Sequence, residues 1–398
     1  MVKDYTAVKK NTSSSHTSEK KKDSIRFYHY GLIGMVSFII LFSSLDYMFG
    51  FTANMPNNEK RKLADFPTYQ AHEVSAFIDG FDAFFKDQFG GRRFFINAYC
   101  WFKLNILKTS PYPENVILGK DNWLFLGKSK AGIYDEHLGI RVVNKRQLDR
   151  MKTNVLENKQ WAEAKGIKYY FMIAPDKYSI YPEQLPSNYS KKHIYHNLDR
   201  LIKYLSPEIE VIDVRQELLS RKDEALLYGL TDSHWTQYGA YIGYEKIINI
   251  IRKDFPGIPK PLALESFWIR QEEVSNQDMS TLINAGENFK DYDLIFNAKE
   301  GPAFDGIASR LKVPKGFKFN KNTYEYRYRA KPNNKIKILI IRDSFSNRLR
   351  KFIPAHFRET IFISNGHKFD KQLIEQEKPD IILHEMVERS FNESLLRY

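Results

Sequence analysis

The sequence predicts an α/β protein in which a parallel sheet carries helices on both faces and follows one membrane-spanning helix. Three observations support this prediction. One long apolar segment lies near the N-terminus. Beyond residue 111, short apolar runs alternate with helical segments. Hydrophobic residues form 42% of the chain, which is enough for a folded core. Parallel strands covered on both faces appear as apolar runs of this kind, because neither face meets water.

The N-terminal segment combines a basic polar tail with an apolar helix. Residues 1–26 are rich in Ser, Thr and Lys, so we expect a disordered tail. Residues 27–49 follow, and the stretch 27–45 contains no Asp, Glu, Lys or Arg. At about 1.5 Å per residue, a helix of this length matches a bilayer core of roughly 30 Å. We expect a membrane anchor, with a buried core helix as the alternative.

The flanking charges predict the orientation of this anchor. Lys20, Lys21, Lys22 and Arg26 precede the apolar segment. By the positive-inside rule, the N-terminus stays in the cytoplasm and the rest of the chain is extracytoplasmic. Cleavage by signal peptidase is the competing expectation, but small residues follow only near Ala53. We expect a retained single-pass anchor in the cell membrane.

Charge and cysteine content exclude several functional classes. The net charge is +13, and the basic residues are scattered rather than gathered into a stripe, which argues against nucleic-acid binding. Attraction to anionic lipid headgroups or to an anionic surface polymer explains the charge better. The single cysteine excludes an internal disulfide. There is no Gly-rich phosphate loop and no CxxC motif, so we expect no cofactor and no nucleotide.

Residues 50–110 are predicted to form a helical connector, broken at Gly90 and Gly91. Aromatic and small residues recur at helical spacing on either side of this break: Phe77, Phe81, Phe84, Phe85, Phe94, Ala98, Trp101 and Phe102. We expect these stripes to pack against the main domain. Docking of a membrane partner is the alternative.

Residues 111–398 are predicted to form one domain with a hairpin followed by alternating strands and helices. The hairpin pairs 116–118 with 123–126 across the turn GKDN. Five apolar runs read as parallel strands: IKYYFMIAP, EIEVIDV, KIKILIIRDSF, TIFIS and PDIILHE. Helices are expected near 145–165, 192–205 and 236–253. Residues of about 257–330 are polar with little periodicity, so we interpret them as an insertion or lid.

Two short motifs lie at predicted strand ends, where α/β proteins gather reactive groups. Ser344 follows the apolar run 336–341 and opens a predicted helix, where its backbone N–H suits an oxyanion. An N-cap role is the alternative for this serine. In Asp232-x-His234, residues i and i+2 of an extended loop project to one side, so the carboxylate is able to orient the imidazole. Capping of the helix near Thr236 is the alternative here.

A metal site is not expected. Among the ten histidines, His193 and His196 are the only close pair, and they lie in the basic stretch KKHIYHNLDR. A solvated helix face explains that stretch better than metal ligation. We therefore expect neither a metal nor a cofactor.

Several motifs together resemble one family. TDSHWTQYGA and IRDSFS resemble the Asp-x-His-Trp and Gly-Asp-Ser-Phe blocks of the alginate O-acetyltransferase (AlgJ/AlgX-like, DHHW) family of SGNH-hydrolase-like proteins. Six further stretches resemble its other landmarks in the same order: EKRKLADFP, FKDQFGGRRFFI, VILGKDNWLFL, IAPDKYSIYPEQLP, NQDMSTLI and KPDIILHEMVERSF. The resemblance covers nearly everything after residue 58. It implies a flavodoxin-like SGNH fold with the permuted order Asp, His, Ser.

The resemblance also implies roles for individual residues. Ser344 would be the nucleophile, His234 the general base and Asp232 the carboxylate that orients the base. Arg342 departs from the family pattern, since it stands where the Gly-Asp-Ser block has glycine. Asn365 and Gly366 are further oxyanion or substrate candidates.

The implied activity is that of a membrane-anchored extracytoplasmic O-acetyltransferase acting on an exopolysaccharide or cell-wall glycan through an acetyl-serine. Acetyl-CoA is cytoplasmic, so the resemblance also implies a multipass membrane O-acyltransferase partner that supplies acetyl groups. A polysaccharide acetyl esterase with the same triad is one alternative. A noncatalytic scaffold of polysaccharide synthesis is another, and the intact Asp232, His234 and Ser344 argue against it.

Overall fold

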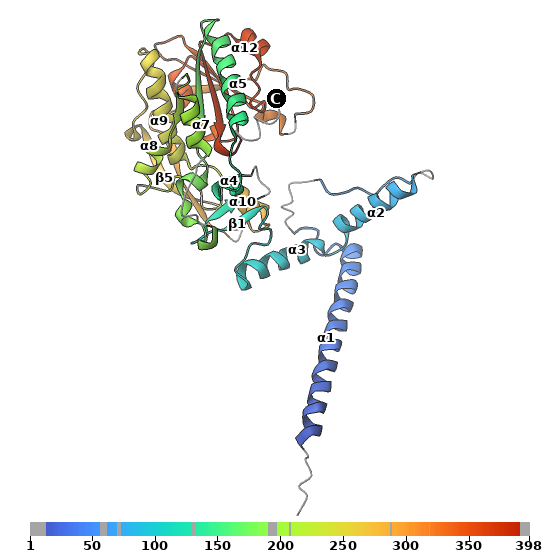
Figure 1. Cartoon of the computed structure of the whole chain (residues 1–398). Coiled ribbons are helices and arrows are strands. Elements are labelled where there is room, and N and C mark those ends of the chain that lie inside the picture. The colour runs from blue at the N-terminus through green and yellow to red at the C-terminus, as the bar shows by residue number, and fades with distance from the viewer. Residues whose placement is uncertain are drawn as a thin grey trace, which may run out of the picture. The chain divides into compact units, whose positions relative to one another are not determined.

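The computed structural model describes residues 13–55, 62–69, 73–128, 132–189, 197–206, 208–286, 289–301, 303–317 and 319–390. The chain divides into two compact units, Met1–Tyr99 and Cys100–Tyr398 (Figure 1). The first unit contains the helices α1 (Ser13–Phe49), α2 (Val74–Gln88) and most of α3 (Arg92–Trp101). The second contains the remaining helices and all strands of the described residues.

Helix α1 differs in one respect from the prediction for the N-terminus. Residues 1–12 lie outside the described part, but the backbone is helical from Ser13, so residues 13–26 are not the disordered tail we expected. The physical reason is that extending an existing helix fixes only one residue per hydrogen bond, whereas starting one is costly. Residues 26–49 are long and apolar enough to cross a membrane, and their side chains are mostly unburied.

The turn between α2 and α3 packs closely against the last turns of α1. Gly91 has φ +75°, and a Cβ atom on it would lie 2.5 Å from the Phe42 ring. A Cβ atom on Gly90 would lie 2.0 Å from the carbonyl oxygen of Ser43. Asp46 accepts hydrogen bonds from Gly91 N at 2.5 Å and from Thr52 N at 2.7 Å. The glycine pair is therefore needed for close approach, because any side chain would collide with α1.

The second unit is built on a seven-stranded sheet with the order β4-β3-β11-β9-β10-β8-β7. Its strands are β3 (Lys168–Ala174), β4 (Val211–Asp213), β7 (Phe304–Ile307), β8 (Glu325–Ala330), β9 (Lys337–Ile341), β10 (Glu359–Ile363) and β11 (Ile381–Val387). The first five strands of this order run parallel to one another. They are the five apolar runs of the sequence, so the predicted parallel sheet is confirmed for this part.

The predicted polar insertion is wrong in its second half. Strands β7 and β8 fall inside it, yet they extend the sheet with antiparallel pairing. Strand β8 was missed because its charges are buried as ion pairs. The guanidinium of Arg327 lies 2.7 Å from Glu325, 2.5 Å from Glu359 and 2.7 Å from Glu377. Pairing of this kind lets a polar strand lie inside a protein.

Helices cover both faces of the sheet. They are α4 (Ile133–His137), α5 (Lys145–Glu163), α6 (Lys177–Ile180), α7 (Asn197–Leu205), α8 (Arg215–Ser220), α9 (Gln237–Asp254), α10 (Asp278–Leu282), α11 (Ser346–Leu349) and α12 (Lys371–Glu377). One hydrophobic core includes side chains of α8 and α9, and another includes those of α5 and α7. The predicted helices near 145–165 and 236–253 are confirmed. Residues 190–196, with His193 and His196, lie outside the described part.

Two hairpins complete the second unit. The predicted hairpin is present as β1 (Val116–Leu118) and β2 (Leu124–Leu126). Strands β5 (Phe267–Val274) and β6 (Asp291–Ala298) form the other, with α10 between them. This second hairpin brings three acidic residues of the predicted insertion to the segment 231–237: Asp278, Asp291 and Asp293.

Candidate active site

Ser344 lies in the turn between β9 and α11. The neighbouring Asp343 fixes this turn, because its carboxylate accepts hydrogen bonds from Phe345 N at 2.8 Å and from Val387 N at 2.7 Å. Ser344 itself is exposed, and α11 has no side-chain cap hydrogen bond. The cap interpretation of this serine therefore has no support in the geometry.

The segment before α9 carries Asp232 and His234. The N-cap of α9 is Thr236, whose Oγ1 accepts from Gly239 N at 3.1 Å, so neither Asp232 nor His234 is needed for capping. Asp232 Oδ1 lies 2.7 Å from His234 Nδ1 and accepts from His234 N at 2.9 Å. The carboxylate therefore holds both the ring and the backbone of the histidine.

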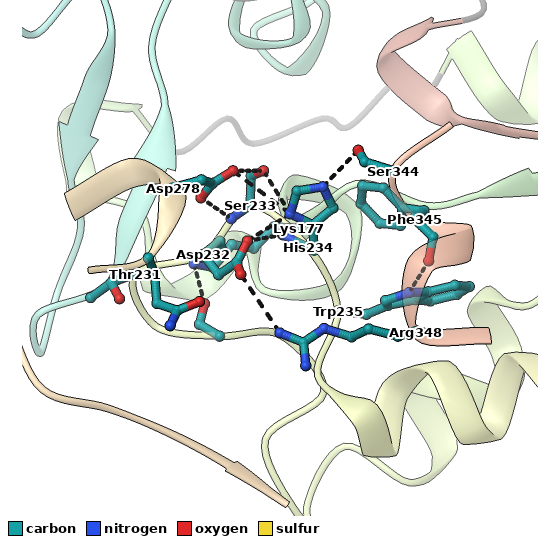
Figure 2. Close-up of polar contacts among 12 residues, drawn as sticks. Lys177, Thr231, Asp232, Ser233, His234, Trp235, Asp278, Ser344, Phe345 and Arg348 are labelled. Carbon is teal, nitrogen blue, oxygen red and sulfur yellow. Dashed lines mark hydrogen bonds and ion pairs between the residues drawn. The ribbon is translucent and has the colours of Figure 1, made fainter. Parts of the chain in front are cut away.

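The three predicted residues meet although Ser344 is far from the others in sequence. His234 Nε2 lies 2.7 Å from Ser344 Oγ, and Figure 2 shows the imidazole between the serine hydroxyl and the Asp232 carboxylate. With the Nδ1 proton held by Asp232, Nε2 is free to accept the hydroxyl proton. Trp235 links the two segments further, since its indole N–H donates to Phe345 O at 2.9 Å. This arrangement is able to activate a serine for attack on an acyl group.

Lys177, at the start of α6, holds the segment that carries Asp232. Its Nζ is buried and donates to four main-chain carbonyl oxygens, those of Leu124, Gly229, Leu230 and Asp232, at 2.8, 2.6, 2.9 and 3.2 Å. Burial lowers the pKa of Lys177 to about 7. The negative charges of Asp291, Asp232 and Asp278 act to raise this pKa but do not outweigh burial. Lys177 lies within the family landmark IAPDKYSIYPEQLP, but its role could not be predicted, because its carbonyl partners come from other segments of the fold.

Two further charged residues surround the histidine and were not predicted. Asp278 accepts from Ser233 N at 2.8 Å and from Ser233 Oγ, and its Oδ2 lies 3.7 Å from His234 Nδ1. Arg348 approaches Asp232 Oδ2 at 3.6 Å and also pairs with Asp293. Asp278 lies in NQDMSTLI, a family landmark in which no residue was predicted to belong to the site.

The surrounding charges determine the protonation of the pair. Burial opposes ionisation of Asp232, but the hydrogen bond from His234 and the charges of His234 and Arg348 outweigh it and lower the pKa of Asp232. Burial alone would lower the pKa of His234, but the hydrogen bond and charge of Asp232, with the charge of Asp278, raise it above 6.5. A general base works in its neutral form, so its activity is lost as the pH falls through this raised pKa.

We therefore expect the acid limb of the pH profile of kcat/KM to lie above pH 6.5. In Asp278→Asn, one negative charge beside the imidazolium is removed, so the pKa of His234 falls and the acid limb moves to lower pH. Asp305→Asn, a change at an exposed position in β7, serves as the control and should leave the profile unchanged. An acid limb that stays in place in Asp278→Asn would contradict the charge assignment.

Asp232, His234 and Asp278 also form a cluster whose ligand atoms all lie within 4.8 Å of one another, which raises the question of a metal. Two ligands of one zinc ion, each at about 2.1 Å from it, would lie roughly 3 Å or more apart. The 2.7 Å between Asp232 Oδ1 and His234 Nδ1 fits a shared proton better. We expect a chelator such as EDTA to leave the activity unchanged. Loss of activity that Zn²⁺ restores would contradict this.

The remaining predicted site residues lie beside the serine turn. Arg342 is buried and donates to Asp343 O at 3.1 Å, Asn347 Oδ1 at 2.9 Å and Thr323 O at 2.7 Å. Its guanidinium therefore braces the turn. Asn365 Nδ2 donates to Lys368 O at 2.8 Å, and Gly366 has φ +72°.

The structure does not bring all of the predicted oxyanion candidates to the histidine. Within the described residues, neither Arg342 nor Asn365 has a hydrogen bond to Ser344, His234 or Asp232. Among the same residues, the backbone N–H of Ser344 has no acceptor, so it is available to a developing oxyanion.

Comparisons with known proteins bear on the fold and on the family model that the chain matches. Residues 116–295 match the family model described as the SGNH hydrolase-like domain of acetyltransferase AlgX, a span that includes Asp232, His234 and Asp278 but ends before Ser344. Comparison with curated protein sequences gives no match.

Solved structures show the fold. PatB1 from Bacillus cereus is 18% identical, with a TM-score of 0.50 over 70% of this chain and 97% of that one. PatB1 with a sulfonyl adduct is 17% identical, with a TM-score of 0.53 over 71% and 97%. The O-acetyltransferase domain of Pseudomonas putida AlgJ is 15% identical, with a TM-score of 0.46 over 70% and 92%. Residues 116–295, a little under half of the chain, are thus similar to the SGNH hydrolase-like domain of acetyltransferase AlgX.

Proposed function

We propose that this protein is a membrane-anchored extracytoplasmic O-acetyltransferase that moves acetyl groups to hydroxyls of an exopolysaccharide or cell-wall glycan. The observation that carries the proposal is the contact chain from Ser344 Oγ through His234 to Asp232, with 2.7 Å at each link. The match of residues 116–295 to the AlgX acetyltransferase family model supports the reaction type.

The first half of the proposed reaction loads the enzyme. His234 Nε2 takes the proton of Ser344 Oγ while this oxygen attacks the carbonyl carbon of an acetyl donor. The Ser344 N–H donates to the oxyanion that forms. The intermediate then expels the leaving group of the donor, which takes the proton from His234. The product is an acetyl ester on Ser344, and His234 is neutral again.

The second half transfers the acetyl group. A glycan hydroxyl gives its proton to His234 Nε2 while its oxygen attacks the acetyl carbon. Ser344 Oγ leaves and takes that proton back, so the free enzyme is restored. Throughout, Asp232 stabilises the imidazolium that forms in each half. Transfer exceeds hydrolysis only if the acceptor hydroxyl is held better than water.

The membrane anchor belongs to the same proposal. Residues 26–49 of α1 are long and apolar enough to span a bilayer, and the basic residues before them favour a cytoplasmic N-terminus. The catalytic unit is then extracytoplasmic, where acetyl-CoA is absent. A multipass membrane acyltransferase is the partner that would deliver acetyl groups to Ser344.

A polysaccharide acetyl esterase is the second candidate function. Ser344 is exposed, so water has access to an acetyl group on its oxygen. The same three residues would then hydrolyse acetyl esters. The two functions differ only in which hydroxyl attacks the acetyl-serine.

The decisive experiment follows the acetyl group on the full chain in detergent. The protein is incubated with an activated acetyl ester, and the mass of the Ser344 peptide is measured with and without a short oligosaccharide acceptor. We expect an acetyl adduct on Ser344 that moves to the acceptor. An adduct lost only to water supports the esterase, and no adduct contradicts both. Since a PatB1 structure carries a sulfonyl adduct, a sulfonyl fluoride should also modify Ser344.

A further inference from the structure

Helix α2 carries an apolar stripe that the described residues of its own unit leave largely exposed. Val74, Ile78, Phe81 and Phe85 recur at the i, i+4, i+7 and i+11 positions, so they share one face of the helix. Their exposed fractions are 47, 60, 44 and 60%. Four neighbouring large apolar side chains in water are unfavourable, and such a patch marks a site of interaction.

The rest of α2 has its partners, so the helix is held in a defined rotation. Phe84 packs edge-on against Phe66, with ring centroids 5.2 Å apart, and Phe77 contacts Phe66 at 6.4 Å. Asp87 accepts from Ala64 N at 2.9 Å. Phe66 also lies edge-on to Phe81 of the stripe, with ring centroids 6.1 Å apart, so these contacts run along one edge of the stripe. The exposed stripe is therefore a fixed surface of this unit.

The C-terminal end of α2 is tied to the end of the candidate membrane helix. The turn after α2 bonds through Gly91 N to Asp46, close to the end of α1 at Phe49. Phe42 of α1 packs against Phe94 and Phe95, with ring centroids 5.3 and 5.7 Å apart. If α1 spans the bilayer, this turn lies at the membrane surface. At about 1.5 Å per residue, α2 is roughly 22 Å long, so every residue of the stripe lies within about that distance of the tethered turn.

We infer that α2 is an interfacial helix that lies on the outer leaflet of the membrane, with Val74, Ile78, Phe81 and Phe85 inserted among the lipids. The inference rests on the proposed membrane anchor and adds a second point of attachment. The opposite side of α2 suits water, since Asp79 and Lys86 are exposed there. A fixed apolar stripe, a polar opposite side and a tether at the bilayer surface are the features of a helix that lies in a membrane interface.

The test uses the full chain in nanodiscs of phosphatidylcholine and phosphatidylglycerol. Nitroxide labels are attached to single cysteines at Ile78 and Phe85 on the stripe and at Asp79 and Lys86 on the polar side. The background is Cys100→Ala, because Cys100 is the only natural cysteine. Collisions with oxygen, which concentrates in lipid, are compared with collisions with a water-soluble nickel complex. We expect the stripe labels to favour oxygen and the polar-side labels to favour nickel.

A label at Ile39 in α1 separates this inference from the proposed anchor. Oxygen access at Ile39 together with nickel access at Ile78 and Phe85 would leave the anchor intact and overturn the interfacial helix. Low access of both agents at the stripe would also overturn it, because a protein surface, and not lipid, would then cover the stripe. Nickel access at Ile39 would refute the anchor and the inference together.

Discussion

Replacing Ser344 by alanine is expected to lower acetyl transfer by at least about 10³-fold, because the oxygen that carries the acetyl group is removed. Ser344 is exposed, so the free energy of unfolding should change by no more than about 0.5 kcal/mol. His234→Ala should cause a loss of similar size, since residues that act as a unit are not additive. The rate of transfer to an oligosaccharide and the unfolding midpoint in urea measure the two effects separately.

A neighbouring serine provides the control for this prediction. Ser346 is buried and donates to Glu385 Oε2 at 2.7 Å, so Ser346→Ala should lower stability yet retain the acetyl adduct on Ser344. The proposed roles would be refuted if Ser344→Ala transferred acetyl groups as fast as the natural protein. They would equally be refuted if Ser346→Ala lost the adduct while remaining folded.

Replacing Lys177 by methionine is expected to destabilise the second unit by about 2–4 kcal/mol, because a buried donor is removed and its carbonyl acceptors are left without it. Methionine has a similar length but donates no hydrogen bond, so four carbonyl oxygens lose their shared partner. Three of these lie between Gly229 and Asp232. The position of Asp232 should loosen, and kcat should fall even under conditions where the variant is folded.

Lys120→Met is the matched control for Lys177→Met. Lys120 also donates to a main-chain carbonyl, that of Glu183 at 2.7 Å, but it is exposed to solvent. Water replaces the lost bond there, so the free energy of unfolding should change by less than about 0.5 kcal/mol. Urea denaturation of both variants measures the difference. If the two variants are equally stable, Lys177 does not hold the Asp232 segment.

Local patterns were sufficient for the five parallel strands and for the choice of Ser344, His234 and Asp232 as candidates. The five parallel strands are continuous apolar runs. Such a run can be recognised in the sequence without knowing which strands lie beside it. Ser344 stood out because it follows the apolar run that forms β9. The strand end predicted for Asp232-x-His234 is wrong, since this motif follows only the isolated bridge between Tyr228 and Trp235. The i and i+2 spacing of Asp232 and His234 already predicts a shared side in an extended loop. Their contact at 2.7 Å agrees with that prediction.

Long-range charge pairing could not be predicted in the same way. Strand β8 looked like part of an insertion, because the sequence shows the charge of Arg327 but not its neighbours in space. Glu359 and Glu377 pair with this charge only in the folded protein. For Lys177 and Asp278, the sequence likewise showed only that they lie within longer motifs, and not which groups they contact. Their importance depends on carbonyl and imidazole groups that other segments bring to them.

The sequence by itself therefore determined the parallel strands, the apolar helix near the N-terminus and the choice of Ser344, His234 and Asp232 as candidates. Each of these is encoded within a few neighbouring residues by periodicity, length or motif. Only the tertiary structure decided that Ser344 Oγ lies 2.7 Å from His234 Nε2, that Lys177 holds the Asp232 segment and that the stripe on α2 is exposed. These features depend on distances between segments far apart in the chain, and folding alone fixes such distances.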